Sequence, residues 1–371
     1  MQTYYDRIKF NIIGDALWMG VAMRQQWASV LVRSKKVVLE TRPIPNPDED
    51  EVLVRVRAVG ICGSDVHYFK EGRIGDFVVE SPIVLGHEVS GEIVAVGAGV
   101  PASRIGERVS LEPQRTDPWS EQSRLGRYNL DPSIEFFATP PYDGALCEYV
   151  TIPSGSAFKV PDVMSFEEAA LLEPLAVAVA AIRHANLRFG DRVAVAGAGP
   201  IGLLVAQLAA FGGASEVVVS DPLAHARARA LRYGATRAID SLVEPFPEQE
   251  FDLFIDASGV PAAIRGGIHS LRPRGCALLL GMGPDTIEIP FSVVQVRELR
   301  LQGVFRYANA WPAAIDFASR IDLAGLITGR YGLRQVPEAL EAAASADQVK
   351  VVVLPEADSD SEGEIEKGAQ G

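Results

Sequence analysis

Residues 191–204 read DRVAVAGAGPIGLL and contain the strongest indication of fold in the chain. A short apolar run leads directly into three glycines in GxGxxG spacing, Gly197, Gly199 and Gly202, and an apolar helix-like segment follows. In this setting the first glycine permits a tight turn and the second lets a pyrophosphate approach the backbone. The third lets helix and strand pack closely, with phosphate at the helix N-terminus. The stretch therefore predicts a dinucleotide-binding βαβ unit.

The next apolar run, EVVVSD, ends at Asp221, nineteen residues after Gly202. An acid about 20 residues beyond such glycines is expected to bind the ribose hydroxyls, and its charge would repel a 2′-phosphate. Across residues 173–307, strand-like runs alternate with helical ones, which is typical of a doubly wound parallel sheet. We predict a Rossmann domain over 173–307 that binds NAD. Arg227 and Arg229 weaken the preference for NAD over NADP without reversing it.

Residues 26–172 have a different pattern. Short alternating or β-branched runs such as EVLVRVRAV and SGEIVAVG are separated by Gly and Pro, which predicts a mostly β, barrel-like domain. Residues 313–326 and 336–355 are expected to form helix, helix and strand, so that 308–355 returns to this first domain. The fold class is therefore α/β with two domains.

The junction between the two domains contains a predicted helix break. Ser165 and Glu168 form a capping box at the start of one helix. Pro174 ends that helix and can begin another. Glu173 is therefore expected at the break.

Composition narrows the class of protein. The 371 residues are 48% hydrophobic, enough for about two domains, and the net charge of −13 without a basic stripe excludes nucleic acid or an anionic membrane as the expected partner. No apolar run approaches the ~20 residues of a membrane span. Three cysteines without a CxxC pair favour a reducing, cytoplasmic setting. Residues 1–25 show no targeting signal and receive no function, and the acidic residues 356–371 are predicted to be disordered.

Two short segments suggest a metal site. GICGSDVHY contains Cys62, and VLGHEVSG contains His87 and Glu88. With Glu173 they form a mixed S, N and O donor set that suits zinc. Adjacent strand residues point to opposite faces, so His87 and Glu88 can share one metal only if the backbone departs from strand geometry, which Gly86 would ease. The fourth position stays open between Glu88, Glu173 and water.

Taken singly, a cysteine among apolar residues is usually a buried small hydrophobe, and a lone histidine is usually structural. Combined with a nucleotide fold, the four residues favour a catalytic zinc. The remaining candidates are expected to be structural: Cys147, Cys276, His184, His225 and His269.

Seven segments resemble a known family: GICGSDVHY, GRIGDFVVESPIVLGHEVSG, GRYNL, FFATPPYDGAL, LLEPLAV, GAGPIGLL and GVFRYANAWP. The family is the sorbitol dehydrogenase branch of the zinc-dependent medium-chain dehydrogenases. The likeness runs from about residue 27 to 355, and GVFRY with GRIGDFVV is specific to the polyol branch. It implies a GroES-like catalytic domain beside the Rossmann domain.

The resemblance also implies roles for residues. Cys62, His87 and Glu88 would hold the catalytic zinc, with Glu173 near or on it, and Asp65 would orient His87. Ser64 and His67 match the family's proton relay. Positions that match its polyol contacts are Tyr68, Glu173, Arg306 and Tyr307. Positions that match its NAD contacts are Ile201, Asp221, Leu280, Gly281, Met282, Phe305, Arg306 and Tyr307.

The chain departs from the family in two places. Many relatives carry a structural zinc on four cysteines where this chain has Asp117, Ser120, Ser123 and Asp131. We therefore predict one zinc per subunit and no structural zinc, with packing and hydrogen bonds holding that lobe. The family's arginine five residues after Asp221 is replaced by Ala226, with Arg227 next to it.

The resulting hypothesis is an NAD-dependent, zinc-dependent dehydrogenase that oxidises a secondary hydroxyl of sorbitol, xylitol or a similar polyol to a ketose. A vicinal diol or threonine dehydrogenase is the nearer alternative, and Arg306 and Tyr307 argue against it. A catalytically silent NAD-binding relative is the other alternative, and it would be expected to lack the zinc ligands. The family implies a homo-oligomer, tetramer or dimer.

Overall fold

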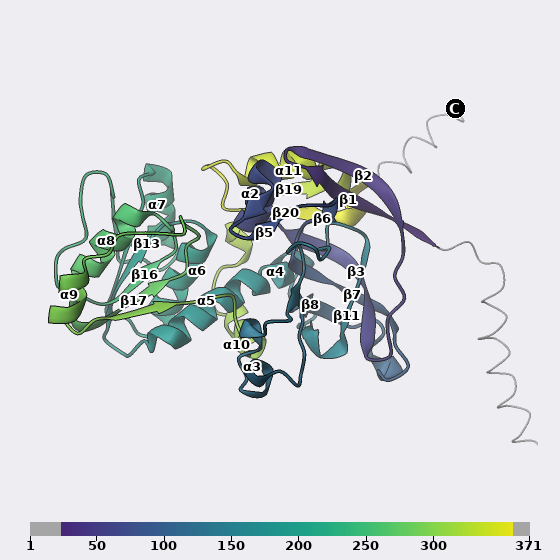
Figure 1. Ribbon diagram of the computed structural model, residues 1–371, viewed down its shortest axis with the longest axis horizontal. Coiled ribbons are helices and arrows are strands. Elements are labelled where there is room, and N and C mark those ends of the chain that lie inside the picture. Colours follow the sequence, from purple (N-terminus) through teal and green to yellow (C-terminus); the bar gives the residue numbers. More distant parts are fainter. Residues whose placement is uncertain (1–23, 359–371) are drawn as a thin grey trace, which may run out of the picture.

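The computed structural model describes residues 24–358, which form two lobes (Figure 1). The predicted extension over residues 1–25 lies outside the described residues except for Arg24 and Gln25, as does the tail from residue 359 onward. One lobe contains the six-stranded parallel sheet and its helices, and the other contains the larger sheet. The predicted α/β class with a mostly β first domain is confirmed.

The first lobe is built on a seven-stranded sheet in the order β12-β8-β7-β3-β20-β19, with β11 paired to β3. Strand β20 comes from the C-terminal part of the chain and pairs antiparallel with β3. The strands are β3 (Glu51–Gly60), β7 (Glu88–Val96), β8 (Arg108–Leu111), β11 (Tyr149–Pro153), β12 (Ala157–Lys159), β19 (Ile327–Gly332) and β20 (Lys350–Leu354).

Smaller elements complete this lobe. The sheet β2-β1-β6 contains β1 (Gln25–Arg33), β2 (Lys36–Pro43) and β6 (Ile83–Val84). Two short pairs are β4 (Arg73–Ile74) with β5 (Phe77–Val78) and β9 (Gln114–Arg115) with β10 (Glu135–Phe136). The helices are α2 (Gly63–Glu71), α3 (Glu121–Arg124), α4 (Phe166–Ala170) and α11 (Val336–Ala343).

Helix α2 begins directly after Cys62, at a point where no helix is predicted above. Its N-cap residue is Cys62, and the Asp65 carboxylate in the first turn accepts the Cys62 N–H at 2.9 Å. A side chain that satisfies a free N–H at a helix start stabilises that start. The helix places Ser64, His67 and Tyr68 within two turns of Cys62.

The second lobe contains six parallel strands in the order β15-β14-β13-β16-β17-β18. The order reverses between β13 and β16, and nucleotide sites of doubly wound sheets lie at such a reversal. The strands are β13 (Arg192–Ala196), β14 (Glu216–Ser220), β15 (Arg237–Ile239), β16 (Phe251–Asp256), β17 (Leu271–Leu279) and β18 (Arg300–Gly303). The helices are α6 (Pro200–Phe211), α7 (Ala224–Arg232), α8 (Pro261–Ser270) and α9 (Phe291–Val296).

The glycine turn has the predicted close packing. A Cβ atom at Gly202 would lie 2.0 Å from the Gly197 carbonyl oxygen, so only glycine fits there. The third glycine therefore lets α6 begin directly against the end of β13.

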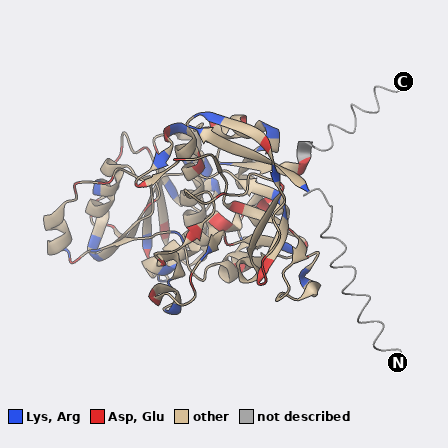
Figure 2. Cartoon of the chain, turned by 45° about the vertical axis from the view of Figure 1, so that its right-hand side comes forward, with Lys and Arg blue, Asp and Glu red and all other residues tan. Residues whose placement is uncertain are grey.

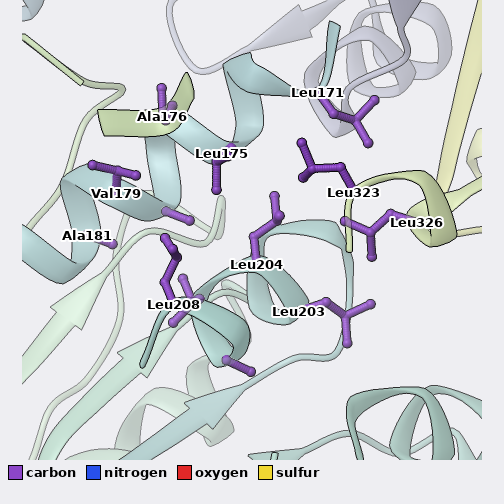
Figure 3. Packing of buried hydrophobic residues seen from close by; sticks show 14 of the residues in the cluster. Leu171, Leu175, Ala176, Val179, Ala181, Leu203, Leu204, Leu208, Leu323 and Leu326 are labelled. Atoms are coloured by element: carbon purple, nitrogen blue, oxygen red, sulfur yellow. The ribbon is translucent and has the colours of Figure 1, made fainter. Parts of the chain in front are cut away.

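The largest apolar cluster lies where α5 (Leu172–Ala185), α6 and α10 (Trp311–Ala318) meet. Figure 3 shows leucines of α5, α6 and the turn around residues 323–326 pointing toward one another. The predicted capping box at Ser165 and Glu168 is confirmed, and Glu173 lies in the first turn of α5, just after the break at Leu171.

The helix expected over 313–326 ends earlier, at Ala318. A 3-10 turn, Ala324–Leu326, follows, and Leu326 and the preceding residue Leu323 are buried in the same cluster as α6. The apolar residues whose spacing suggested a helix are therefore buried at a turn. Helix α10 packs in the same cluster as the parallel-sheet helices, while the boundary at residue 308 stays a prediction.

Charges are scattered over both lobes. Figure 2 shows blue and red segments interspersed in this view, without a continuous basic stripe on the residues it draws. Glu356, at the predicted start of the tail, lies in the turn Pro355–Asp358 and pairs with Arg57. Within residues 24–358, none of the helices combines the length and apolar character needed to cross a membrane.

Candidate active site

Three predicted metal ligands converge in the first lobe. Cys62 precedes α2, His87 precedes β7, and Glu88 is the first residue of β7. One donor atom from each lies within 4.8 Å of the others. Gly86 has a φ of +88°, and the chain turns there so that His87 leaves strand geometry before Glu88 begins the strand. Adjacent residues can therefore face one point.

The cluster is buried and rich in negative charge. Glu88, Glu173 and Asp65 are 1%, 5% and 0% exposed. Lys350 supplies one buried positive charge, and its Nζ donates to the two Glu88 oxygens at 2.6 and 2.9 Å and to the Ile61 carbonyl at 3.1 Å. Burial raises the pKa of Glu173. The pocket thus holds more acidic groups than its own cation can balance.

The pKa of His87 is raised by the same excess of negative charge. Burial alone would lower the pKa of His87, but the Cys62 sulfur and the carboxylates of Asp65 and Glu173 outweigh it and raise this pKa to about 10. A buried site that attracts a proton so strongly also attracts a metal cation. Sulfur, imidazole and carboxylate donors are those that zinc prefers, so the residues fit zinc.

Asp65 lies beside His87 but does not hydrogen-bond to it. Its carboxylate is 3.9 Å from the His87 Nδ1 atom, which is too long for a hydrogen bond. The carboxylate instead accepts the Cys62 N–H and the Gly86 N–H, each at 2.9 Å. Asp65 therefore fixes the two ligand-bearing turns relative to each other, which is a different contact from the one the resemblance implies.

One cavity of about 470 Å³ gathers most of the predicted site residues. They come from both lobes. The predicted residues that line it are Cys62, Ser64, His67, Tyr68, His87, Glu88, Glu173, Gly199, Ile201, Leu280, Gly281, Met282, Phe305 and Arg306. Ser64 is half-buried and His67, one turn further along α2, is exposed. The two therefore lead from the cavity toward solvent.

Tyr307 lies behind the cavity, outside its lining. It is 1% exposed, and its hydroxyl donates to Glu173 Oε1 at 2.7 Å. Arg306 does line the cavity, with its guanidinium 3.6 Å from the ring centre of Phe136 and its Nη2 donating to Thr139 Oγ1 at 3.2 Å. Tyr307 thus holds Glu173, while Arg306 presents a cation between aromatic rings.

The remaining predicted cofactor residues lie at the glycine turn and the end of β14. Gly197, Gly202 and Asp221 are outside the cavity lining. The Asp221 carboxylate accepts the Ala198 N–H and the Leu223 N–H, each at 2.9 Å. These contacts fix it beside the turn.

Residues 117–131 form a segment of the first lobe, called the 117–131 lobe, that is held in place by hydrogen bonds. Asp131 is 2% exposed, and its carboxylate accepts the Asp117 N–H at 2.6 Å and both the N–H and the hydroxyl of Ser133 at 3.0 and 2.9 Å. Ser120 bonds to Ser123 at 3.0 Å. Within residues 24–358, Cys62, His87 and Glu88 form the one cluster of at least three such donors close enough to share a metal.

Sequence reasoning missed several residues of the site. Lys350 is 4% exposed inside QVKVVVL, and a charged residue in an otherwise apolar strand signals a buried partner. That signal was available in the sequence. Phe136 and Thr139 carry no such signal, because nothing in their neighbourhood along the chain points to Arg306.

The chain is similar to known proteins over most of its length. The alcohol dehydrogenase GroES-like domain family matches residues 48–162, and the zinc-binding dehydrogenase family matches residues 200–320. A sorbitol dehydrogenase of Gallus gallus is 41% identical over 348 residues, which cover 90% of this chain and 97% of the relative. A D-xylulose reductase of Saccharomyces cerevisiae is 40% identical over 332 residues, 85% of this chain and 93% of the relative.

The chain belongs to the zinc-binding dehydrogenases, in their polyol dehydrogenase branch. A solved zinc-binding dehydrogenase from Sinorhizobium meliloti has a TM-score of 0.83 to this dehydrogenase at 29% identity, and the match covers 90% of this chain and 100% of that one. That neighbour was solved bound to NADP. The predicted family and fold are therefore confirmed.

Proposed function

We propose that this dehydrogenase oxidises a secondary hydroxyl of an alditol such as sorbitol or xylitol to a ketose, while a hydride passes to NAD and a proton is released. The observation that carries the proposal is one cavity that joins the donors Cys62, His87 and Glu88 to the polar pair Glu173 and Arg306 and to the glycine turn. Relatives at 41% and 40% identity are a sorbitol dehydrogenase and a D-xylulose reductase.

We propose that Cys62, His87 and Glu88 hold one zinc ion, with Glu173 beside it. Bound there, zinc would supply a Lewis acid that lowers the pKa of a substrate hydroxyl. Lys350 keeps the Glu88 carboxylate in place through bonds to both of its oxygens. Asp65 keeps the two ligand-bearing turns together.

The polar groups of the cavity suit a chain of hydroxyls. Arg306 and Tyr68 line it, and Glu173 is held by the Tyr307 hydroxyl at 2.7 Å. Donors and acceptors of this kind bind several substrate hydroxyls at once, which a site for a simple alcohol would not need. This favours an alditol over threonine, which carries an ammonium and a carboxylate.

Ser64 and His67 provide a route for the released proton. Ser64 lines the cavity, and His67, exposed one turn further along α2, reaches solvent. A hydroxyl followed by an imidazole is a common general-base arrangement. We propose that the released proton leaves the cavity along these two residues.

For the cofactor, Asp221 supports NAD. Its carboxylate is fixed at the end of β14 by two N–H groups, where it would bind ribose hydroxyls and repel a 2′-phosphate. The three free cysteines support a reducing, cytoplasmic setting. We also propose a homo-oligomer, which size-exclusion chromatography with light scattering would test.

The test is NADH formation with sorbitol, xylitol, ribitol, arabinitol, 2,3-butanediol and threonine, before and after chelation and after zinc is restored. We expect turnover on at least one alditol that chelation abolishes and zinc restores. Turnover confined to butanediol or threonine would move the protein to another branch of the family. Bound zinc and NAD without turnover on any of them would contradict the proposal.

A further inference from the structure

A second acid lies beside the ribose-binding Asp221. Strands β14 and β15 are parallel neighbours, and the Asp221 N–H donates to the Ile239 carbonyl at 3.1 Å. Asp240 is the next residue after Ile239, just past the end of β15. The carboxyl ends of adjacent parallel strands meet at the same edge of the sheet, so both acids face the cofactor side.

Arg227 joins these two strand ends. Its Nη1 donates to the Asp221 carbonyl at 2.9 Å and to the Pro222 carbonyl at 2.8 Å, and its Nη2 is 3.0 Å from Asp240 Oδ2. The Arg227 side chain is 20% exposed and that of Asp240 is 30% exposed. Ala226, at the family's arginine position, is buried. These three contacts hold the guanidinium between the ends of β14 and β15.

A 2′-phosphate adds about −1.5 to −2 charges and three strong acceptor oxygens. Arginine is the side chain best suited to bind such a group, because its planar fork makes paired, charge-assisted hydrogen bonds. Arg227 is the arginine bonded to the Asp221 carbonyl, and it would have to leave Asp240 to meet a phosphate there.

We infer that Asp240 is a specificity-determining residue for the cofactor, because it holds Arg227 in an ion pair and so withholds it from the 2′-phosphate of NADP. This inference rests on the proposed use of NAD at Asp221. It assigns the discrimination to two acids: Asp221 repels the phosphate, and Asp240 removes the cation that would offset that repulsion.

The test uses Asp240→Asn in the full-length enzyme. Asp240 Oδ1 also accepts the Leu242 N–H at 3.0 Å, and an asparagine oxygen keeps this bond, so the turn after β15 is preserved. Binding of NADH and of NADPH is measured by nicotinamide fluorescence without substrate. We expect NADPH to bind roughly tenfold more tightly to the variant, the scale of one charge-assisted hydrogen bond, with NADH affinity unchanged within about twofold.

Loss of a negative charge alone is the competing explanation for a gain in NADPH affinity, so Arg227 must be varied as well. In a double-mutant cycle, Arg227→Gln in the Asp240→Asn background is expected to abolish the gain in NADPH affinity. Glu244→Gln is the matched control. Glu244 lies four residues after Asp240 and pairs with Arg237, and the substitution removes the same charge as Asp240→Asn. We expect this control to leave the ratio of NADH to NADPH affinity unchanged.

Two results would overturn the inference: no tightening of NADPH in Asp240→Asn, or a gain that persists in the double variant. Failure of the proposed use of NAD gives a different result, since the unmodified enzyme would then fail to bind NADH, whereas failure of the proposed alditol oxidation would appear in the turnover assay and leave these titrations unchanged. The two failures are therefore distinguishable in one set of titrations.

Discussion

The zinc pocket and the 117–131 lobe both contain buried acids, but they compensate them in different ways. In the proposed zinc pocket, where Cys62, His87 and Glu88 lie together, Lys350 is the buried cation bonded to Glu88. In the lobe, the Asp131 carboxylate accepts three hydrogen bonds from neighbouring N–H and O–H groups. A buried cluster in which sulfur, imidazole and carboxylate donors lie close enough to share one ion is therefore a better indication of a metal site than buried acids alone.

The largest effect is expected from Cys62→Ser. Loss of a soft sulfur donor should release zinc and lower kcat/KM on the active alditol by more than about 1,000-fold. Zinc per subunit by mass spectrometry and steady-state kinetics check this. Cys147→Ser is the control, because Cys147 is buried away from the cavity lining. Full zinc content in Cys62→Ser would show that the pocket does not depend on this ligand.

Lys350→Met tests the charge balance of the zinc pocket directly. Removing the cation leaves the Glu88 carboxylate buried without its partner, which should cost the chelated protein about 3–5 kcal/mol of unfolding free energy. A bound dication replaces the missing charge, so the loss should be smaller with zinc. Urea unfolding with chelator and with zinc measures both values, and Lys350→Arg keeps the charge as a control. An equal loss in both forms would contradict the account of the pocket.

Glu112 is a buried carboxylate beside the 117–131 lobe, and neither a lysine nor a proposed metal site compensates its charge. Burial raises its pKa to about 7, although the Tyr128 hydroxyl and the Gln114 amide donate to it at 2.8 and 3.0 Å. Between the ordinary pKa of 4.5 and about 7, the folded state keeps a proton that the unfolded state has released. Its contribution to stability is therefore complete below about pH 4.5 and is lost as pH rises through about 7.

The corresponding change in unfolding free energy is about 3 kcal/mol. Glu112→Gln, which stays neutral and keeps an acceptor for Tyr128, should remove this part of the pH dependence. Urea titrations at pH 5 and pH 8 on both proteins measure it. The same pH dependence in the two proteins would assign it to another group.

The smallest effect is expected from Asp131→Ala. The variant leaves the Asp117 N–H and the Ser133 donors unpaired, which should cost about 2 kcal/mol of unfolding free energy while zinc per subunit stays constant. Asp131→Asn, which keeps an acceptor oxygen, should lose less. Calorimetry and metal analysis check both variants. A fall in zinc content would show that the lobe takes part in metal binding.

Much of the fold was predictable because its signals are local. The glycine spacing after β13, the acid at the end of β14 and the capping box at Ser165 each arise within a few residues, and each has its predicted place. Helix α2 was missed because its start depends on the Asp65 side chain reaching back to Cys62. The helix expected to extend to residue 326 ends at Ala318, because Leu323 and Leu326 reach the core from a 3-10 turn and not from a continued helix.

The site was predictable as a set of residues but less so as a set of contacts. Cys62, His87 and Glu88 come together as their chemistry required. The bonds from Lys350 to Glu88 and from Tyr307 to Glu173 join residues 262 and 134 positions apart. No periodicity or local motif encodes such pairs, so they required the folded chain.

The most direct test of the central claim is to return zinc to chelated full-length enzyme, measuring bound zinc and alditol-dependent NADH formation in the same samples. We expect activity to rise in proportion to bound zinc and to reach its maximum at one zinc per subunit. Activity in the metal-free protein, or a maximum reached only at two zinc ions per subunit, would contradict it.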